Sequence, residues 1–238
     1  LTELQGVGPK LLEKLSALGV SQVTDLLFHL PIRYEDRTRI FPIGSCLPGQ
    51  RVLIEGKVEH SAIVRGRRPM LVVVLSDGTG RITLRFFHFY FYQKQQLSSG
   101  TNIRCFGEVR AGYQGLEMVH PAYQRLSGQH AEPIADRLTP VYPGTEGFGQ
   151  KTWIRMTDQA LALMRDGKLE LEELLPGGLL DKLKLMSLSE ALDYIHRPPP
   201  DADISALIQR DHPTQKRLAL EELLAHNLSM QKLHRLQR

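Results

Sequence analysis

The sequence predicts an α+β protein in which a small β-barrel lies between two helical segments. Two changes of pattern along the 238 residues carry this prediction. Apolar residues recur every three or four positions near both ends of the chain, which indicates helices. From about Gln50 the period falls to two, and β-branched residues and turn glycines become frequent, as in strands. After Leu138 the strand pattern stops.

The N-terminal segment, residues 1–45, is expected to be a helical element. In PKLLEKLSALG, residues 9–19, one apolar stripe is formed by Leu11, Leu12, Leu15 and Leu18. Pro9 suits the first turn of a helix, and Gly19 follows the last periodic residue as a stop. A second short helix is predicted in VSQVTDLLFHL, residues 20–30, where Pro31 ends it.

The middle segment, residues 46–128, is expected to be an OB-fold. Its five strand candidates span residues 51–65, 70–77, 81–87, 101–110 and 115–124. A helical element is expected between the third and the fourth, at residues 90–98. Other small barrels share the strand count, but this position of the helix favours a five-stranded OB-fold β-barrel, which commonly binds oligonucleotides.

Residues 129–238 are expected to be a helical linker. The helical spacing returns at residues 153–166 and in LELEELL, residues 169–175, and HRPPPD is a rigid break. Residues 213–238 follow as one long amphipathic helix. The helix has no glycine stop before Arg238, so we expect the chain to be a fragment of a longer polypeptide.

Composition places the chain among ordinary soluble globular proteins. It is 42% apolar and 24% charged, and no run of 18 apolar residues could span a membrane. The N-terminus lacks the layout of a signal peptide, so we expect a cytoplasmic protein and a monomer. Cys46 and Cys105 are expected to be buried thiols, because two distant cysteines supply neither a disulfide framework nor a zinc site.

The basic residues gather in the middle segment. Residues 51–125 hold 11 Lys or Arg and 5 Asp or Glu, a net charge of +6, whereas the whole chain has +4. A local basic excess of this kind is typical of a module that binds a polyanion.

Catalytic motifs are absent from the sequence. GTEGFGQKT, residues 144–152, resembles a phosphate-binding P-loop, but Gln150 separates the last glycine from Lys151 and Thr152. There is no HExxH, no metal-like histidine pair and no nucleophile elbow. We therefore expect this chain alone to have no catalytic site, no metal and no cofactor.

Two short segments are candidates for contact with DNA phosphate. The loop RGRRP contains Arg65, Arg67 and Arg68, which either form a solvated hairpin tip or bind phosphate through their forked donors. Near the N-terminus, Gly6 and Gly8 precede a helix as in helix-hairpin-helix elements, whose backbone N–H groups contact phosphate. There Lys10 would assist, although any tight turn between packed helices gives the same pattern.

The run FFHFYFYQKQQ, residues 86–96, divides into core and exposed rings. Strand alternation puts Phe86 in the core with the other apolar residues of its face, and puts Phe87 on the opposite face with Arg81 and Arg85. If residues 90–98 form a helix, Tyr90 points inward with Leu97. Phe91 then lies outside with Lys94, and Tyr92 is a weaker third exposed ring. Exposed rings beside cations suit base stacking, and packing against another domain is the alternative.

Several motifs together resemble the N-terminal part of the RecG family of bacterial branched-DNA translocases. They are LxGVGPK, DLLFHLPIRYEDRT, SDGTGRITLRFF, LTPVYPGTEG, HRPPP and LALEELLAHNLSM, spread from Leu4 to Met230. The resemblance implies that the OB-fold is a wedge domain, which splits parental from nascent strands at a fork. It also implies that Phe87 and the aromatic four residues later, Phe91, stack on bases at the junction.

The resemblance further implies a role in replication forks and Holliday junctions, in recombination and repair. ATP and Mg²⁺ would act in helicase lobes that follow Arg238 in the full-length enzyme. The chain departs from the family pattern in its extra rings, Phe89, Tyr90 and Tyr92. A different interpretation is a protein-interaction module whose barrel binds a partner peptide, such as the tail of single-stranded-DNA-binding protein.

Overall fold

The computed structural model describes the chain in two compact units. It describes residues 1–238 except residues 3, 66–68, 127–132, 145–147 and 237–238. Residues 1–34 and 139–238 form one unit, which we call the helical unit, and residues 35–138 form the strand unit. The N-terminal helices and the C-terminal helical segment, which the sequence predicts as separate domains, both belong to the helical unit.

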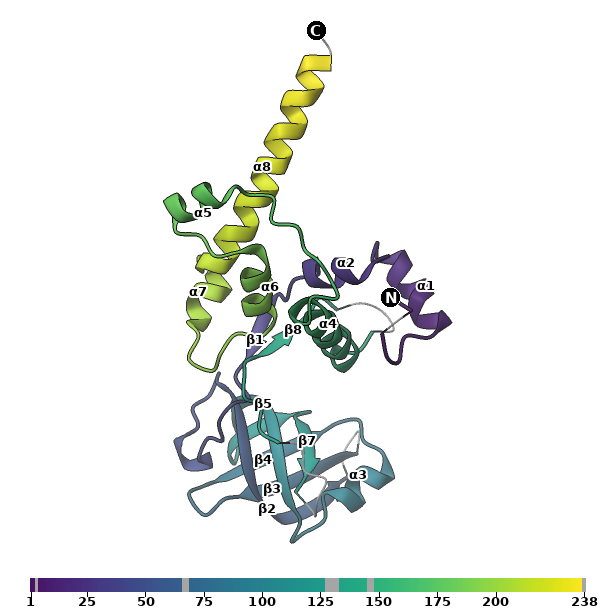
Figure 1. Cartoon of the computed structure of the whole chain (residues 1–238). Helices are drawn as coiled ribbons and strands as arrows, with labels where there is room; N and C mark the ends of the chain where they lie inside the picture. Colours follow the sequence, from purple (N-terminus) through teal and green to yellow (C-terminus); the bar gives the residue numbers. More distant parts are fainter. Residues whose placement is uncertain (3, 66–68, 127–132, 145–147, 237–238) are drawn as a thin grey trace. The chain divides into compact units, whose positions relative to one another are not determined.

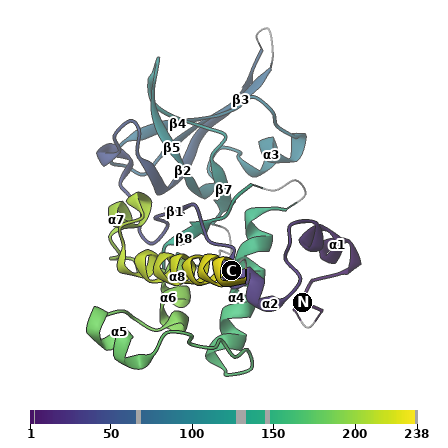
Figure 2. The ribbon, with the colours of Figure 1, turned by 90° about the horizontal axis from the view of Figure 1, so that it is seen from above.

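The strand unit contains a closed ring of five strands (Figures 1 and 2). These strands are β2 (Arg51–Val64), β3 (Met70–Ser76), β4 (Arg81–Phe86), β5 (Asn102–Gly112) and β6 (Gly115–Val119). Their order is β2-β3-β4-β6-β5, and β5 also pairs with β2, which closes the ring. All neighbours are antiparallel except β4 and β6, which are parallel.

The helix α3 (Phe91–Gln96) lies between the third and fourth strands of the ring, as predicted. With the strand order it confirms the OB-fold. The predicted fifth strand is in fact two, because β7 (Ala122–Arg125) follows β6 after a break at His120 and Pro121 and pairs with β5. A 3-10 turn, η1 (Ile43–Ser45), precedes the ring.

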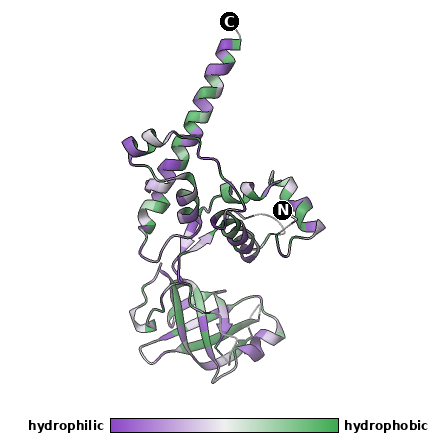
Figure 3. Cartoon of the chain, in the orientation of Figure 1, coloured by the Kyte–Doolittle hydropathy of each residue, from purple (hydrophilic) through white to green (hydrophobic). Residues whose placement is uncertain are grey.

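Alternation along the strands builds the core of this unit. Figure 3 shows hydrophilic and hydrophobic residues in alternating bands along the strands. The inward residues form one buried cluster, which includes Ile54, Leu71, Leu84, Val109 and Met118. Cys105 is buried in the same cluster, and Cys46 joins it from the end of η1; both are free thiols.

The helical unit contains seven helices among its described residues. They are α1 (Pro9–Ala17), α2 (Val23–Phe28), α4 (Gln150–Arg165), α5 (Gly177–Leu183), α6 (Leu188–His196), α7 (Ile204–Gln209) and α8 (Pro213–Leu236). Two short strands, β1 (Arg33–Glu35) and β8 (Thr139–Val141), pair with each other. The core gathers around Trp153, Leu26, Leu27 and Leu161.

One predicted helix, residues 169–175, is wrong. The segment LELEELL has no regular secondary structure, and its alternate residues Leu169 and Leu171 pack against the core. Glu173 fixes this path, because its carboxylate accepts hydrogen bonds from the backbone N–H groups of Leu175 at 3.1 Å and Leu188 at 2.8 Å. The contacts of one carboxylate thus override the helical propensity of the segment.

Candidate nucleic-acid interface

The inward face predicted for β4 is confirmed, although Thr83, which alternation puts on the outward face, is also buried. Ile82, Leu84 and Phe86 are all buried in the core of the strand unit. The ring of Phe86 meets that of Tyr123 edge-on, with centroids 5.8 Å apart, and Tyr123 in turn donates its hydroxyl to Gln96 of α3 at 2.9 Å. Phe86 is therefore a structural residue that links β4 to β7.

Phe87 follows the last residue of β4 and points out of the core. Its side chain is 48% exposed. Its backbone N–H donates a hydrogen bond to Nε2 of His120 at 3.2 Å, and the two rings lie 5.7 Å apart. Phe87 is thus a partly exposed apolar ring on a backbone that is tied to the neighbouring strand.

The start of α3 presents three more exposed rings. Phe91 and Tyr90 are 70% and 71% exposed, and Tyr92 is also exposed. Tyr90 and Tyr92 stack on each other, with centroids 5.7 Å apart and planes 10° from parallel. The exposure predicted for Phe91 and Tyr92 is present, and Tyr92 also stacks on Tyr90.

The prediction that Tyr90 points inward is wrong. The helix begins at Phe91, so Tyr90 precedes it with an extended backbone, φ −99° and ψ 156°. The seven-residue helical spacing from Tyr90 to Leu97 therefore does not apply. Leu97 is buried, and the ring that packs against the core ahead of the helix is Phe89.

Strand register brings one of the predicted cations to the same end of the ring of strands as Phe87. Val64 pairs with Met70, and Leu71 pairs with Phe86. The residues that follow, Arg65 after β2 and Phe87 after β4, therefore lie at one end of β3. Lys94 is exposed on α3, in its last turn. Arg67 and Arg68 lie outside the described residues.

The two predicted cations on β4 already have carboxylate partners. Arg81 is at the opposite end of β4, about 17 Å from Phe86 by strand rise, and its Nε lies 2.8 Å from Glu59. Arg85 is largely buried, with Nε 2.6 Å from Glu117 of β6. Ion pairs of this kind leave Arg81 and Arg85 less available to bind phosphate.

The N-terminal glycine turn belongs to the helical unit. Gly6 has a left-handed backbone with φ +79°, which favours glycine, and its carbonyl accepts from Arg155 at 3.4 Å. Gly8 is the N-cap of α1, and Lys10 is exposed in the first turn. The turn and the helix start expected from the sequence are present, and phosphate contact there stays a prediction.

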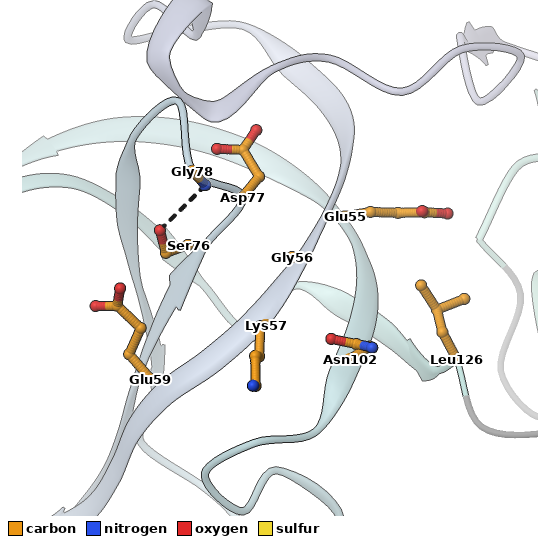
Figure 4. Close-up of a pocket in the computed structure, with 9 residues that line it drawn as sticks. All are labelled: Glu55, Gly56, Lys57, Glu59, Ser76, Asp77, Gly78, Asn102 and Leu126. Carbon is orange, nitrogen blue, oxygen red and sulfur yellow. Dashed lines mark hydrogen bonds between the residues drawn. The ribbon is translucent and has the colours of Figure 1, made fainter.

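A hollow on the strand unit is unfavourable for DNA phosphate, because three carboxylates and only one lysine are among its lining residues (Figure 4). It measures about 580 Å³ and is lined by Glu55, Gly56, Lys57, Glu59, Ser76, Asp77, Gly78, Asn102 and Leu126. Its carboxylates are engaged, since Glu55 pairs with Arg104 and Glu59 pairs with Arg81. The third, Asp77, accepts from backbone N–H groups of its own turn and of Ile43.

The P-loop-like segment does not fit ATP. Gln150, which stands where a P-loop has lysine, uses its amide to bond the backbone N–H and C=O of Tyr142, at 2.8 and 2.9 Å. The residue that breaks the motif therefore has a structural role. Over the described ranges, no three His, Cys, Asp or Glu side chains gather where they could hold a metal ion. No helix there is both long and apolar enough to cross a membrane.

Two residues were not singled out from the sequence, one beside Phe87 and one at the opposite end of β6. His120 contacts Phe87 from the corner between β6 and β7, and only its pairing with β4 reveals this. Tyr113 is 99% exposed in the tight turn between β5 and β6. Its place in the AGYQG turn was a signal for exposure.

Comparison with known proteins identifies the family. A family model described as the RecG wedge domain matches residues 3–164, more than half of the chain. The chain belongs to the RecG wedge domain family. The match to the RecG wedge domain includes the whole strand unit together with α1, α2 and most of α4.

Individual RecG proteins match almost the whole chain. It is 46% identical over 233 residues to the ATP-dependent DNA helicase RecG of Pasteurella multocida, covering 98% of this chain and 33% of that protein. With the RecG of Escherichia coli K12 the identity is 47% over 231 residues, covering 97% and 33%. The chain thus spans about a third of the length of these curated relatives.

A solved RecG structure has the same fold. The structure of RecG bound to a three-way DNA junction superimposes with a TM-score of 0.66 at 29% identity, covering 97% of this chain and 30% of that one. The predicted membership of the RecG family and the OB-fold are both confirmed.

Proposed function

We propose that this chain binds branched DNA and separates strands at the junction, through Phe87 and Phe91. The observation that carries the proposal is the pair of outward rings that follow β4, 48% and 70% exposed, on an OB-fold. A related RecG has been solved on a three-way DNA junction, which supports the same substrate class here.

Base stacking is the chemistry that these rings offer. A flat apolar ring can cover a base whose neighbour has been removed, at about 1–3 kcal/mol per stacked base. At a fork the last base pair of each arm exposes such a face. Phe87, tied to β6 through His120, would cover the base pair where the duplex opens, and Phe91 would stack on a base of the second strand.

Cations near the rings would hold the phosphates. Arg65 lies at the same end of the strands as Phe87, and Lys94 is exposed on α3 beside Phe91. Arg67 and Arg68 continue the same loop in the sequence. Phosphate contacts fix orientation without reading sequence, so recognition would depend on the branched shape.

Strand separation at this site needs no catalytic group. In a protein as long as the relatives, we infer that ATP and Mg²⁺ act outside these residues and drive DNA past the wedge. Both template strands would then be drawn past the rings, and regression of a replication fork or branch migration of a Holliday junction would follow. The part of this chain in that process would be to bind the branched DNA, to cover the exposed base pair and to separate the strands.

The decisive experiment compares DNA affinities of the chain and of a double variant. Binding to a three-way fork, a linear duplex and a single strand is measured for the wild type and for Phe87→Ala with Phe91→Ala. We expect the variant to lose fork affinity by at least about fivefold, the equivalent of one stacked base. Phe28→Ala, an equally exposed phenylalanine of the helical unit, is the matched control.

A double variant that keeps full fork preference would show that the stacking assignment is wrong. Salt separates the remaining alternative, a barrel that binds an apolar partner peptide. Affinity for DNA falls steeply with salt because counterions are released on binding, whereas an apolar peptide contact changes little. Preference for the tail peptide of single-stranded-DNA-binding protein over forks at every salt concentration would favour the peptide function.

A further inference from the structure

We propose that His120 is a positioning residue, which holds Phe87 in place for base stacking. This inference rests on the proposed function and adds to it a residue that touches no base. His120 lies at the corner between β6 and β7, before Pro121, with a left-handed φ of +46°. Its contacts reach four residues in a row, from Arg85 at the end of β4 to His88.

The imidazole of His120 replaces a missing rung of the sheet. Arg85 pairs with Val119 in the parallel β4–β6 ladder, and its carbonyl accepts from the N–H of His120 at 2.9 Å. In a longer ladder the next rung would join the N–H of Phe87 to the carbonyl of His120. The strand turns away at His120 instead, and its side-chain Nε2 accepts from Phe87 at 3.2 Å.

The imidazole ring of His120 also packs against the side chains of Phe86 and Phe87. Its centroid lies 5.7 Å from that of Phe87 and 6.0 Å from that of Phe86, which it meets at 90°. Because Phe86 is buried, the imidazole of His120 packs against a side chain that is itself held in the core. His120 thus joins a fixed ring, Phe86, to an exposed one, Phe87.

Positioning matters because stacking depends on order that exists before binding. An exposed side chain that must be ordered on binding loses part of its interaction energy to conformational entropy. A backbone held by hydrogen bonds at both Arg85 and Phe87 carries less of that cost. Loss of the acceptor should therefore weaken fork binding more than binding to a linear duplex, which offers no exposed base at a junction.

The test uses three substitutions in the whole chain. His120→Gln places an acceptor oxygen the same number of bonds from the backbone as Nε2, whereas His120→Ala has none. His120→Gly also has none, but it accepts the left-handed backbone without strain. Readouts are the hydrogen-exchange rate of the Phe87 amide, the ratio of fork to duplex affinity, and the thermal midpoint.

We expect faster Phe87 exchange and a loss of fork preference of roughly five- to tenfold in the Ala and Gly variants, as for one hydrogen bond. Duplex affinity should stay within about twofold, and Gln should restore most of the preference. A purely structural residue would lower the thermal midpoint and weaken binding to all DNA alike.

Three outcomes would overturn the inference. If Phe87→Ala loses fork preference but His120→Ala and His120→Gly keep it, Phe87 stacks without help from His120, and the proposed function stands alone. If Phe87 exchange is unchanged in both variants, the hydrogen bond does not order this backbone. A fork preference that survives Phe87→Ala would instead count against the proposed function itself, and the positioning role would fall with it.

Discussion

Nδ1 of His196 lies 2.9 Å from the hydroxyl oxygen of Tyr142 in the buried core of the helical unit. Nε2 of the same ring lies 2.8 Å from the carbonyl oxygen of Leu27. Because a carbonyl only accepts, Nε2 carries the hydrogen, and Nδ1 accepts from Tyr142. The hydroxyl of Tyr34 donates to the carbonyl of Ile195 at 2.6 Å. These bonds join α6 to α2, to β1 and to the residue after β8.

Acid should destabilise the helical unit before its carboxylates titrate. Burial lowers the pKa of His196 to about 4, from an ordinary value of 6.5. The unfolded chain therefore binds this proton more tightly, and the stability is complete above about pH 6.5 and falls toward pH 4. Between pH 7.5 and pH 5 we expect a loss of about 2 kcal/mol. Denaturant unfolding followed by fluorescence of Trp153, the single tryptophan, measures it.

The variant His196→Gln isolates the contribution of this residue to the pH dependence of stability. Burial also lowers the pKa of His29, which stacks on Trp153 at 4.1 Å, so the wild-type pH dependence includes both rings. Glutamine has a donor and an acceptor but does not titrate in this range. The variant should lose much less stability between the two pH values, and an unchanged slope would show that His196 is not the sensor.

A second prediction concerns Arg217, a fully buried arginine of α8. Its guanidinium lies 2.6 Å from both Glu173 and Glu221, and its Nε donates to the carbonyl of Met186 at 3.1 Å. Arg217→Met removes the cation and leaves the two partly buried carboxylates unpaired. We expect the free energy of unfolding to fall by about 3 kcal/mol, as measured by denaturant titration.

The neighbouring residue provides the control for Arg217. Lys216 pairs with Asp211 at 2.7 Å, but both side chains are exposed. An exposed pair contributes at most about 1 kcal/mol, so Lys216→Ala should change stability little. Equal losses in the two variants would contradict the role given to the buried cation.

Much of the strand unit was predictable because alternation is local. The period of two located each strand of the ring, and parity at β4 separated Phe86 from Phe87 without tertiary information. The error at Tyr90 has a local cause, since the side-chain direction depends on whether a six-residue helix starts one position earlier or later. Short helices give too few turns for periodicity to fix their ends.

Contacts between distant segments were not predictable. The motifs DLLFHLPIRYEDRT, LTPVYPGTEG and HRPPP identified the family, yet nothing in them shows that Leu27, Tyr142 and His196 meet. The charge count likewise could not show which cations are paired with carboxylates in the folded chain. Arg85 and Arg104 count as cations in the sequence, but each faces a carboxylate on an adjacent strand.

Arg85 and Lys94 should therefore respond differently to removal. Lys94 is exposed on α3, so Lys94→Ala should weaken binding to all DNA and lower the slope of log affinity against log salt by about 1. Arg85→Ala leaves Glu117 unpaired in a largely buried place and should cost about 1–3 kcal/mol of stability. Salt titrations of fork binding, together with thermal unfolding, separate the two effects. A stable Arg85→Ala variant with a reduced salt slope would make Arg85 a phosphate ligand instead.

The last prediction concerns Gly56, where β2 leaves β5 and joins β3. Lys57, the next residue, pairs with both Asn102 and Ser76. A Cβ at Gly56 would lie 2.7 Å from the carbonyl oxygen of Ser76, which is backbone and cannot turn aside. Gly56→Ala must therefore push β2 and β3 apart, at a cost of about 1–3 kcal/mol. Thermal unfolding followed by circular dichroism should show a lower midpoint.

Gly78→Asn is the control for Gly56 in the same unit. Gly78 has φ +87° and no atom within 4 Å of a Cβ, and asparagine tolerates a left-handed backbone better than other side chains. It should cost clearly less than Gly56→Ala. Because β3 connects the end of β2 that carries Arg65 to the end of β4 that carries Phe87, the alanine variant should also lose fork preference at temperatures where it is still folded. Full fork preference in a destabilised variant would show that the rings do not depend on the closed ring of strands for their position.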